Sequence, residues 1–289
     1  MTLLPKKFAQ RATFGVALFF ALNAFSAGKT ETYQDIIEKA YNLSLQKDRA
    51  QAINLLVNAA KKESKKGKVP IEILNALDEV STVFFSDKAQ QLHELALSLW
   101  MNDPNLASQK LADAARLEAE NQQIQLGQIR LQIGAGDCAS ALKAVRKDID
   151  LNPYSEELKL ALAQATLCTG TIAEYQALKG GADPKRNGLE VFWQALDIES
   201  AFRASNLVKG RDLVTGLLKS DPGYPESTYW LWKFNNELKT PDERSGQKYL
   251  AACKSLSSRA SRKYLAEPRL CRRTSEVEAE LKKTANPGS

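Results

Sequence analysis

Apolar residues recur every three to four positions along nearly the whole chain from Thr30 onward. This spacing collects them on one face of an α-helix, whereas a half-buried strand would show strict alternation, and no window of this part of the sequence does. The pattern predicts an all-α chain with helices over residues 32–45, 48–63, 70–84, 87–101, 105–119, 122–135, 137–150, 155–169, 172–179, 189–204, 206–219, 225–238, 243–258 and 270–284.

The predicted helices are separated by short connections that carry helix stop signals. Proline follows Asp or Asn in three of them, and glycines break two others. Helices of this length with such connections form either a globular bundle or a solenoid of antiparallel pairs, and internal repetition favours the solenoid. The separators are Asp103-Pro104, Asn152-Pro153, Asp221-Pro222, Gly134-Ala135-Gly136 and Gly180-Gly181.

The clearest repeat unit spans residues 122–155, a helix, a Gly-Asp turn, a second helix and an Asn-Pro stop. It resembles the tetratricopeptide repeat (TPR), and the matching positions are Gly136 and Asp137 in the turn, Ala141 and Val145 in the second helix, and Pro153 at the end. The resemblance implies a right-handed α-superhelix, a solenoid of antiparallel helix pairs, whose function is to bind proteins.

The repeats are degenerate. Ile129 and Asp148 stand where the family usually has small residues. In the next unit Tyr175 also occupies a position that is usually small, and the second helix ends early at Gly180. We therefore expect an irregular superhelix rather than a regular array.

Two of the four cysteines are placed symmetrically about a predicted turn. Cys138 and Cys168 each lie 15 residues from Pro153, so each stands about 22 Å along its helix at 1.5 Å per residue and faces the other. A disulfide between them is the leading interpretation, and two buried thiols that pack as small apolar groups are the alternative. By exclusion the second pair is Cys253–Cys271, which leaves no thiol for redox or nucleophilic chemistry.

The first 27 residues have the order of a secretory signal peptide: a basic start, an apolar stretch and a small-residue exit at Ala24–Ala27. The alternative is a retained transmembrane anchor, but only 17 consecutive residues are uncharged, and a spanning helix needs about 20. We expect a signal peptide over 1–27, a TPR-like domain over 28–258 and a basic capping segment over 259–289.

Loss of the leader would lower the formal charge from +6 to +3, and the excess lies in residues 241–289, with 11 Lys and Arg against 6 Asp and Glu. This balance is too weak to indicate a nucleic-acid partner. After processing, no stable membrane insertion is expected either.

Catalytic motifs are not apparent. The single histidine, His93, lies on a predicted helix, where packing is the commoner role than metal binding. The sequence carries no phosphate-binding loop, nucleophile elbow or zinc-protease pattern. No catalytic residue, metal or cofactor is therefore predicted.

The resemblance places a partner-binding groove along the first helix of each repeat, with a buried core position as the alternative for each residue. The matching positions are Gln123, Leu126, Arg130, Glu157, Leu160 and Gln164. Trp230 and Trp232 are a possible aromatic anchor for a partner, although large aromatics on a solenoid helix more often pack between helices.

These observations predict a non-catalytic, exported scaffold or adaptor that binds a partner protein or peptide in its concave groove. The predicted location is the periplasm of a bacterial cell envelope, with secretion as the second choice. The alternatives are a structural subunit of an envelope machine (motor, pilus or secretion complex), or a cell-wall-acting enzyme subunit that resembles the superhelix of lytic transglycosylases. A catalytic subunit is disfavoured because no second domain is left to hold an active site.

Overall fold

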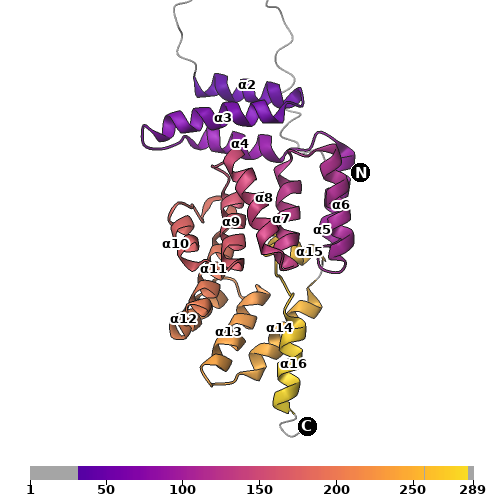
Figure 1. Cartoon of the computed structure of the whole chain (residues 1–289), viewed down its shortest axis with the longest axis vertical. Coiled ribbons are helices and arrows are strands. Elements are labelled where there is room, and N and C mark those ends of the chain that lie inside the picture. Colours follow the sequence, from indigo (N-terminus) through magenta and orange to yellow (C-terminus); the bar gives the residue numbers. More distant parts are fainter. Residues whose placement is uncertain (1–31, 257, 286–289) are drawn as a thin grey trace, which may run out of the picture. The chain divides into compact units, whose positions relative to one another are not determined.

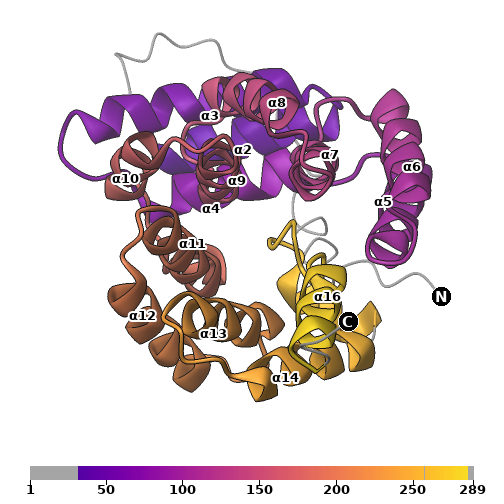
Figure 2. The same ribbon diagram turned by 60° about the horizontal axis from the view of Figure 1, so that its bottom comes forward.

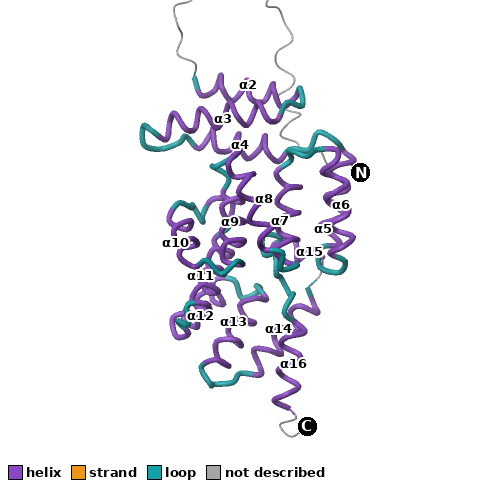
Figure 3. The backbone as a smooth tube through the Cα atoms, viewed as in Figure 1, coloured by secondary structure: helices purple, strands orange, loops and turns teal. Residues whose placement is uncertain are grey.

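The computed structural model describes residues 32–256 and 258–285, and the leader expected over 1–27 lies outside them. The compact unit begins at Tyr33. Within the described ranges every regular element is an α-helix or a short 3-10 helix, and no strand occurs there (Figure 3). The all-α prediction is therefore confirmed. None of the described helices is long and apolar enough to cross a bilayer.

The helices follow the predicted order, with boundaries displaced by only a few residues. They are α2 (Tyr33–Leu45), α3 (Arg49–Ser64), α4 (Ile71–Thr82), α5 (Asp87–Leu99), α6 (Pro104–Leu117), α7 (Gln122–Gly134), α8 (Cys138–Leu151), α9 (Glu156–Cys168), α10 (Ile172–Gly180), η1 (Arg186–Gly188), α11 (Glu190–Arg203), α12 (Leu207–Ser220), α13 (Pro225–Glu237), α14 (Glu243–Ser255), α15 (Ser258–Ser261), η2 (Arg262–Tyr264) and α16 (Thr274–Ala285).

From α5 onward the helices pack as successive pairs: α5 with α6, α7 with α8, α9 with α10, α11 with α12, and α13 with α14. The first helices of neighbouring pairs also contact one another, because α7 packs on α9, α9 on α11 and α11 on α13 (Figure 1). This consecutive packing is the TPR-like superhelix that the sequence predicts. Its elements contact mainly their neighbours, as in other solenoids.

Side-chain caps explain where several of these helices begin. Asp103 accepts a hydrogen bond from the Leu106 backbone at 2.9 Å, and Asp137 accepts one from Ser140 at 3.3 Å. Such caps satisfy backbone donors that have no partner inside the helix. The turn before α8 also needs Gly136, whose φ of +83° is a left-handed conformation that glycine adopts without strain.

The core is divided into four apolar clusters along the chain. One joins α2, α3 and α4, a second joins α5, α6 and α7, and a third joins α7, α8 and α9. The largest runs from α9 to α16 and contains most of the buried aromatic side chains. Tyr175 is completely buried there, so the large residue at this usually small position is part of the packed core.

Gly210 in α12 gives a local test of this packing. A Cβ atom placed there would overlap the Phe234 ring, whereas one on Gly216 of the same helix would meet nothing within 4 Å. We expect Gly210→Ala to lower the free energy of unfolding by about 1 to 3 kcal/mol through overpacking. Gly216→Ala should instead raise it by about 0.5 to 1 kcal/mol, because alanine favours the helix. Urea denaturation measures both, and equal effects would contradict the close approach.

Candidate functional site

Both predicted disulfides are present. Cys138, the first residue of α8, is bonded to Cys168, the last residue of α9, across a Cα–Cα distance of 5.7 Å. Cys253 of α14 is bonded to Cys271 across 5.5 Å. The described residues contain no free cysteine. The equal distance of Cys138 and Cys168 from the turn therefore predicted their contact correctly.

The segment that begins with η2 and ends just before α16, residues 262–273, lies against the first helices of the pairs (Figure 2). We call it the C-terminal strap. The Gln164 side chain of α9 donates to the Ala266 carbonyl at 2.6 Å, and the Arg272 guanidinium donates to the Trp100 carbonyl at 3.1 Å. At Gly134 a Cβ atom would lie 2.5 Å from the Pro268 carbonyl oxygen, so only glycine lets α7 approach the strap this closely. The strap thus contacts three successive pairs.

Two mostly buried arginines of the strap pair with buried glutamates of the superhelix. Arg269 makes a bidentate ion pair with Glu199 of α11, which also pairs with Arg203 at 2.8 Å. Arg273 pairs with Glu226 of α13, whose side chain is only 1% exposed. Planar guanidinium groups suit such two-oxygen recognition. These contacts attach the strap to α11 and α13.

The two glutamates differ in their electrostatics. Burial opposes ionisation of Glu199, but its arginine partners, Arg269 first, lower its pKa to about 2. Burial, with a smaller contribution from the charge of Glu267, raises the pKa of Glu226 to about 7 against the attraction of Arg273. Glu226 accepts a hydrogen bond from the Cys271 backbone at 2.8 Å and a longer one, at 3.4 Å, from the Tyr249 hydroxyl of α14. Its cationic partner, Arg273, belongs to the strap.

An inner cavity of about 340 Å³ remains between the first helices and the strap. Three of the six predicted groove residues, Gln123, Arg130 and Glu157, line it. Arg130 pairs with Glu157 at 3.2 Å, and the Arg130 Nε atom is buried without a hydrogen-bond partner among the described residues. The apolar walls and the polar roof are formed by Leu97, Trp100, Leu189, Phe192, Arg262 and Lys263.

The other three predicted groove residues are buried. Leu126 and Leu160 are at most 1% exposed and belong to core clusters, and Gln164 is 2% exposed beneath the strap. Trp230 and Trp232 of the predicted aromatic anchor are also buried, 6% and 2% exposed, within the aromatic core of the second half of the unit. The structure thus brings Gln123, Arg130 and Glu157 together and places the rest in the packing.

His93 lines the inner cavity and is only 5% exposed. Its ring is tilted against Phe84 with centroids 5.3 Å apart, and its Nδ1 atom is buried without a hydrogen-bond partner among the described residues. Burial lowers its pKa, so the ring is neutral near pH 7. In the part of the chain that the structure describes, no group of three or more His, Cys, Asp or Glu side chains has a metal-binding arrangement.

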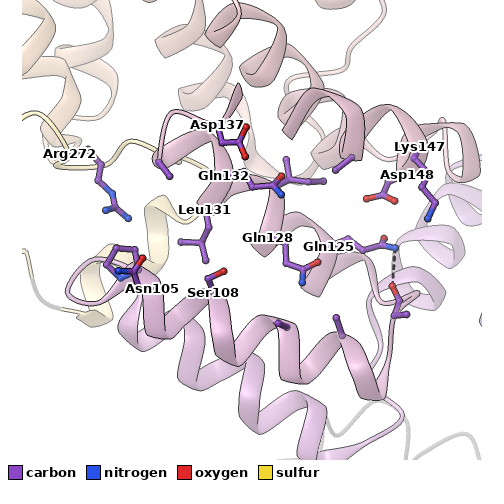
Figure 4. A pocket seen from close by; sticks show the side chains of 17 residues that line it. Asn105, Ser108, Gln125, Gln128, Leu131, Gln132, Asp137, Lys147, Asp148 and Arg272 are labelled. Carbon is purple, nitrogen blue, oxygen red and sulfur yellow. Dashed lines mark hydrogen bonds between the residues drawn. The ribbon is translucent and has the colours of Figure 1, made fainter. Parts of the chain in front are cut away.

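A second hollow, the outer groove, of about 600 Å³, opens on the opposite side of α7 (Figure 4). Residues 123, 127 and 130 face the inner cavity and residues 125, 128 and 132 face the outer groove. At 100° per residue these two sets point in nearly opposite directions. The outer groove separates α6 from α8, the second helices of two neighbouring pairs, and sequence reasoning did not identify it.

The chain matches no family model. It also matches no curated protein. Among solved structures it is similar to a tetratricopeptide repeat protein from Parabacteroides merdae ATCC 43184, at 15% identity and a TM-score of 0.40, over 88% of this chain and 92% of that one. It is similar also to a monomeric mutant of IFIT1 with m7Gppp-AAAA, at 12% identity and a TM-score of 0.40, over 88% of this chain and 70% of that one. The helix pairing of the described residues itself makes this a TPR-like helical repeat.

Proposed function

We propose that this chain is an exported, non-catalytic scaffold of the bacterial cell envelope that binds a partner protein or peptide at the inner cavity. The observation that carries the proposal is the cavity of about 340 Å³, where Gln123, Arg130 and Glu157 converge from successive first helices. Helical-repeat superhelices serve as protein-binding surfaces, so a hollow lined by their first helices suits that role.

Export is supported by two independent features. The leader pattern over 1–27 directs a chain out of the cytoplasm. The two disulfides, Cys138–Cys168 and Cys253–Cys271, are of the kind that persists in oxidising compartments. Together they favour the periplasm.

The size and chemistry of the inner cavity indicate what enters it. Its volume lies near the lower end of ligand sites, about 300 to 1,000 Å³, so a few residues of a partner fit there and a whole helix does not. Arg130 offers donors to a carboxylate or carbonyl, Glu157 accepts from an amide, and Trp100 and Phe192 provide apolar walls. The strap holds this hollow in shape, which lowers the ordering cost of binding.

The test is site-specific photocrosslinking in the native envelope. A benzophenone amino acid is placed at Gln123, which is exposed at the inner cavity, and as a control at Asn54, which is exposed on α3 outside it. We expect a discrete crosslinked partner from position 123 and none from position 54. Adding Arg130→Ala should reduce the yield of that adduct at least fivefold.

Equal adducts from both positions, or an adduct that persists unchanged with Arg130→Ala, would contradict binding at the inner cavity. Co-purification with one large assembly, without any adduct at Gln123, would favour a structural subunit of an envelope machine instead.

A further inference from the structure

The outer groove lies between α6 and α8, the second helices of two neighbouring pairs. In a regular array these two helices would pack against each other, but here they do not. In this structure α6 packs on α5 and α7, and α8 packs on α7 and α9, but the space between α6 and α8 is open. Its floor is α7 and its walls are α6 and α8 (Figure 4).

One side chain in this groove has no structural explanation. Asp148 of α8 is only 8% exposed and lines the groove, yet its carboxylate makes no hydrogen bond or ion pair with any residue that the structure describes. Burial raises its pKa to about 6, and the nearby charge of Lys147 opposes that rise only partly. Its oxygen atoms are not fully enclosed, so they can be reached from the groove. Asp148 also replaces the small residue that is usual at this position of the repeat.

Figure 4 shows the Asp148 side chain directed into the space between α6 and α8. The other charged groups that line the groove leave it unpaired. Lys147 is exposed on the preceding position of the helix, Arg272 donates to the Trp100 carbonyl, and Asp137 caps α8. A cationic group that entered the groove would therefore find one carboxylate that is open to the groove and unpaired among the described residues.

Neutral hydrogen-bonding side chains run along the remainder of the groove. Gln125, Gln128 and Gln132 follow one face of α7, with Asn105 and Ser108 on α6 opposite them (Figure 4). The Gln125 amide nitrogen donates to the Ala119 carbonyl at 3.0 Å, which leaves its Oε1 atom to accept a bond from a peptide. The Gln132 Oε1 atom is buried without a hydrogen-bond partner among the described residues. Each glutamine amide both donates and accepts, as a peptide group does.

The spacing of these amides suits an extended chain. Residues 125 to 132 span about 10 Å of helix at 1.5 Å per residue, which equals about three residues of an extended peptide at 3.3 Å each. Ala112, Ala115 and Ala119 line the opposite wall, and their short side chains leave room for a backbone. The groove lining contains no aromatic residue, so a flat ring or sugar has no stacking surface there.

We propose that the outer groove between α6 and α8 binds an extended peptide segment of a partner protein, and that Asp148 receives the ammonium group of a lysine side chain on that segment. The glutamines of α7 bond to the peptide backbone, and Asp148 selects the basic side chain. This site lies on the opposite side of α7 from the inner cavity and does not depend on binding there.

The probe is the pentapeptide acetyl-Ala-Ala-Lys-Ala-Ala-amide, titrated at pH 7.5 into the oxidised full chain. Proton–nitrogen NMR spectra follow the side-chain amide signals of Gln125, Gln128 and Gln132. We expect saturable shifts of these signals, and at least tenfold weaker binding of the same peptide with acetylated lysine. Asp148→Asn should weaken binding of the lysine peptide by about tenfold or more, the usual loss for a bond to a charged group.

Two further variants keep this result interpretable. Asp148→Ala restores the residue usual in the repeat, so it should fold, as circular dichroism will check, and should also lose binding. Asp150→Asn removes an exposed carboxylate of the same helix and should leave binding unchanged. Equal binding of the acetylated peptide, or undiminished binding by Asp148→Asn, would overturn the proposal, as would n-butylamine binding as tightly as the peptide. Absence of any shift with the lysine peptide would overturn it as well.

Discussion

Replacing Arg273 by methionine is expected to lower the free energy of unfolding by about 3 to 5 kcal/mol, because it leaves the buried Glu226 charge without its partner. Glu226 is 1% exposed, and Arg273 also lies over the Tyr229 ring, 4.5 Å from its centroid. Methionine retains most of the apolar contact with that ring. The loss measured by chemical denaturation therefore reports mainly on the charge.

A double variant separates charge from packing. Arg273→Met/Glu226→Gln removes both charges and should recover more than half of the loss, since replacement of a whole buried pair is far less costly than removal of one member. Lys283→Met, which breaks the exposed pair with Glu280, should cost less than about 1 kcal/mol. If Arg273→Met behaves like Lys283→Met, the buried pair does not hold the strap.

The pH dependence of the Arg273→Met variant has a definite sign. Burial already raises the pKa of Glu226 to about 7, and removal of Arg273 raises the pKa further. A carboxyl group whose pKa is higher in the folded than in the unfolded state destabilises the fold when the pH lies above its folded-state pKa. This destabilisation disappears as the pH falls to its unfolded-state pKa. The destabilisation by Arg273→Met should consequently be larger at pH 8 than at pH 5.

The helix pattern was predictable because periodicity, caps and stop signals are local. Residues 122–155 specify a helix pair with Gly136 in its turn, and the chain forms that pair. The Cys138–Cys168 bond was predictable for the same reason, since both residues belong to one hairpin. Gln123, Arg130 and Glu157 line the inner cavity because the spacing of first-helix positions is retained there.

The position of the strap could not be predicted, because its contacts join residues far apart in the sequence. Gln164 bonds to Ala266 across 102 positions, and Arg272 bonds to Trp100 across 172. The only local signal was the density of arginines in residues 259–273, which the sequence analysis interpreted as part of a basic capping segment. Arg269 and Arg273 are instead mostly buried, with side chains 17% and 14% exposed.

The outer groove could not be predicted either, because its opening depends on how far α6 lies from α8. The one sign of it in the sequence was Asp148 at a position where the repeat usually has alanine. A single departure of that kind does not distinguish a tolerated surface residue from a buried, unpaired carboxyl.

Removing the second disulfide by Cys253→Ala/Cys271→Ala is expected to lower the free energy of unfolding by about 3 kcal/mol in the chain-entropy model. The residues lie 18 apart. Cys271 itself has a left-handed φ of 55°, and its backbone N–H donates to Glu226. Without the bond, both this strained conformation and the neighbouring Arg273 contact lose a constraint, so opening of the strap should precede global unfolding.

Native-state hydrogen exchange distinguishes that local effect from a general loss of stability. Amides of residues 264–273 should exchange at least tenfold faster in Cys253→Ala/Cys271→Ala, while those of α3 keep their protection. Cys138→Ala/Cys168→Ala is the matched control, because it removes the disulfide between residues 30 apart in another part of the chain. It should cause a similar global loss, about 3 to 4 kcal/mol, but no selective exchange in the strap. If both variants exchange alike along the whole chain, the second disulfide stabilises the unit as a whole. The inner cavity would then owe its shape to helix packing rather than to a clamped strap.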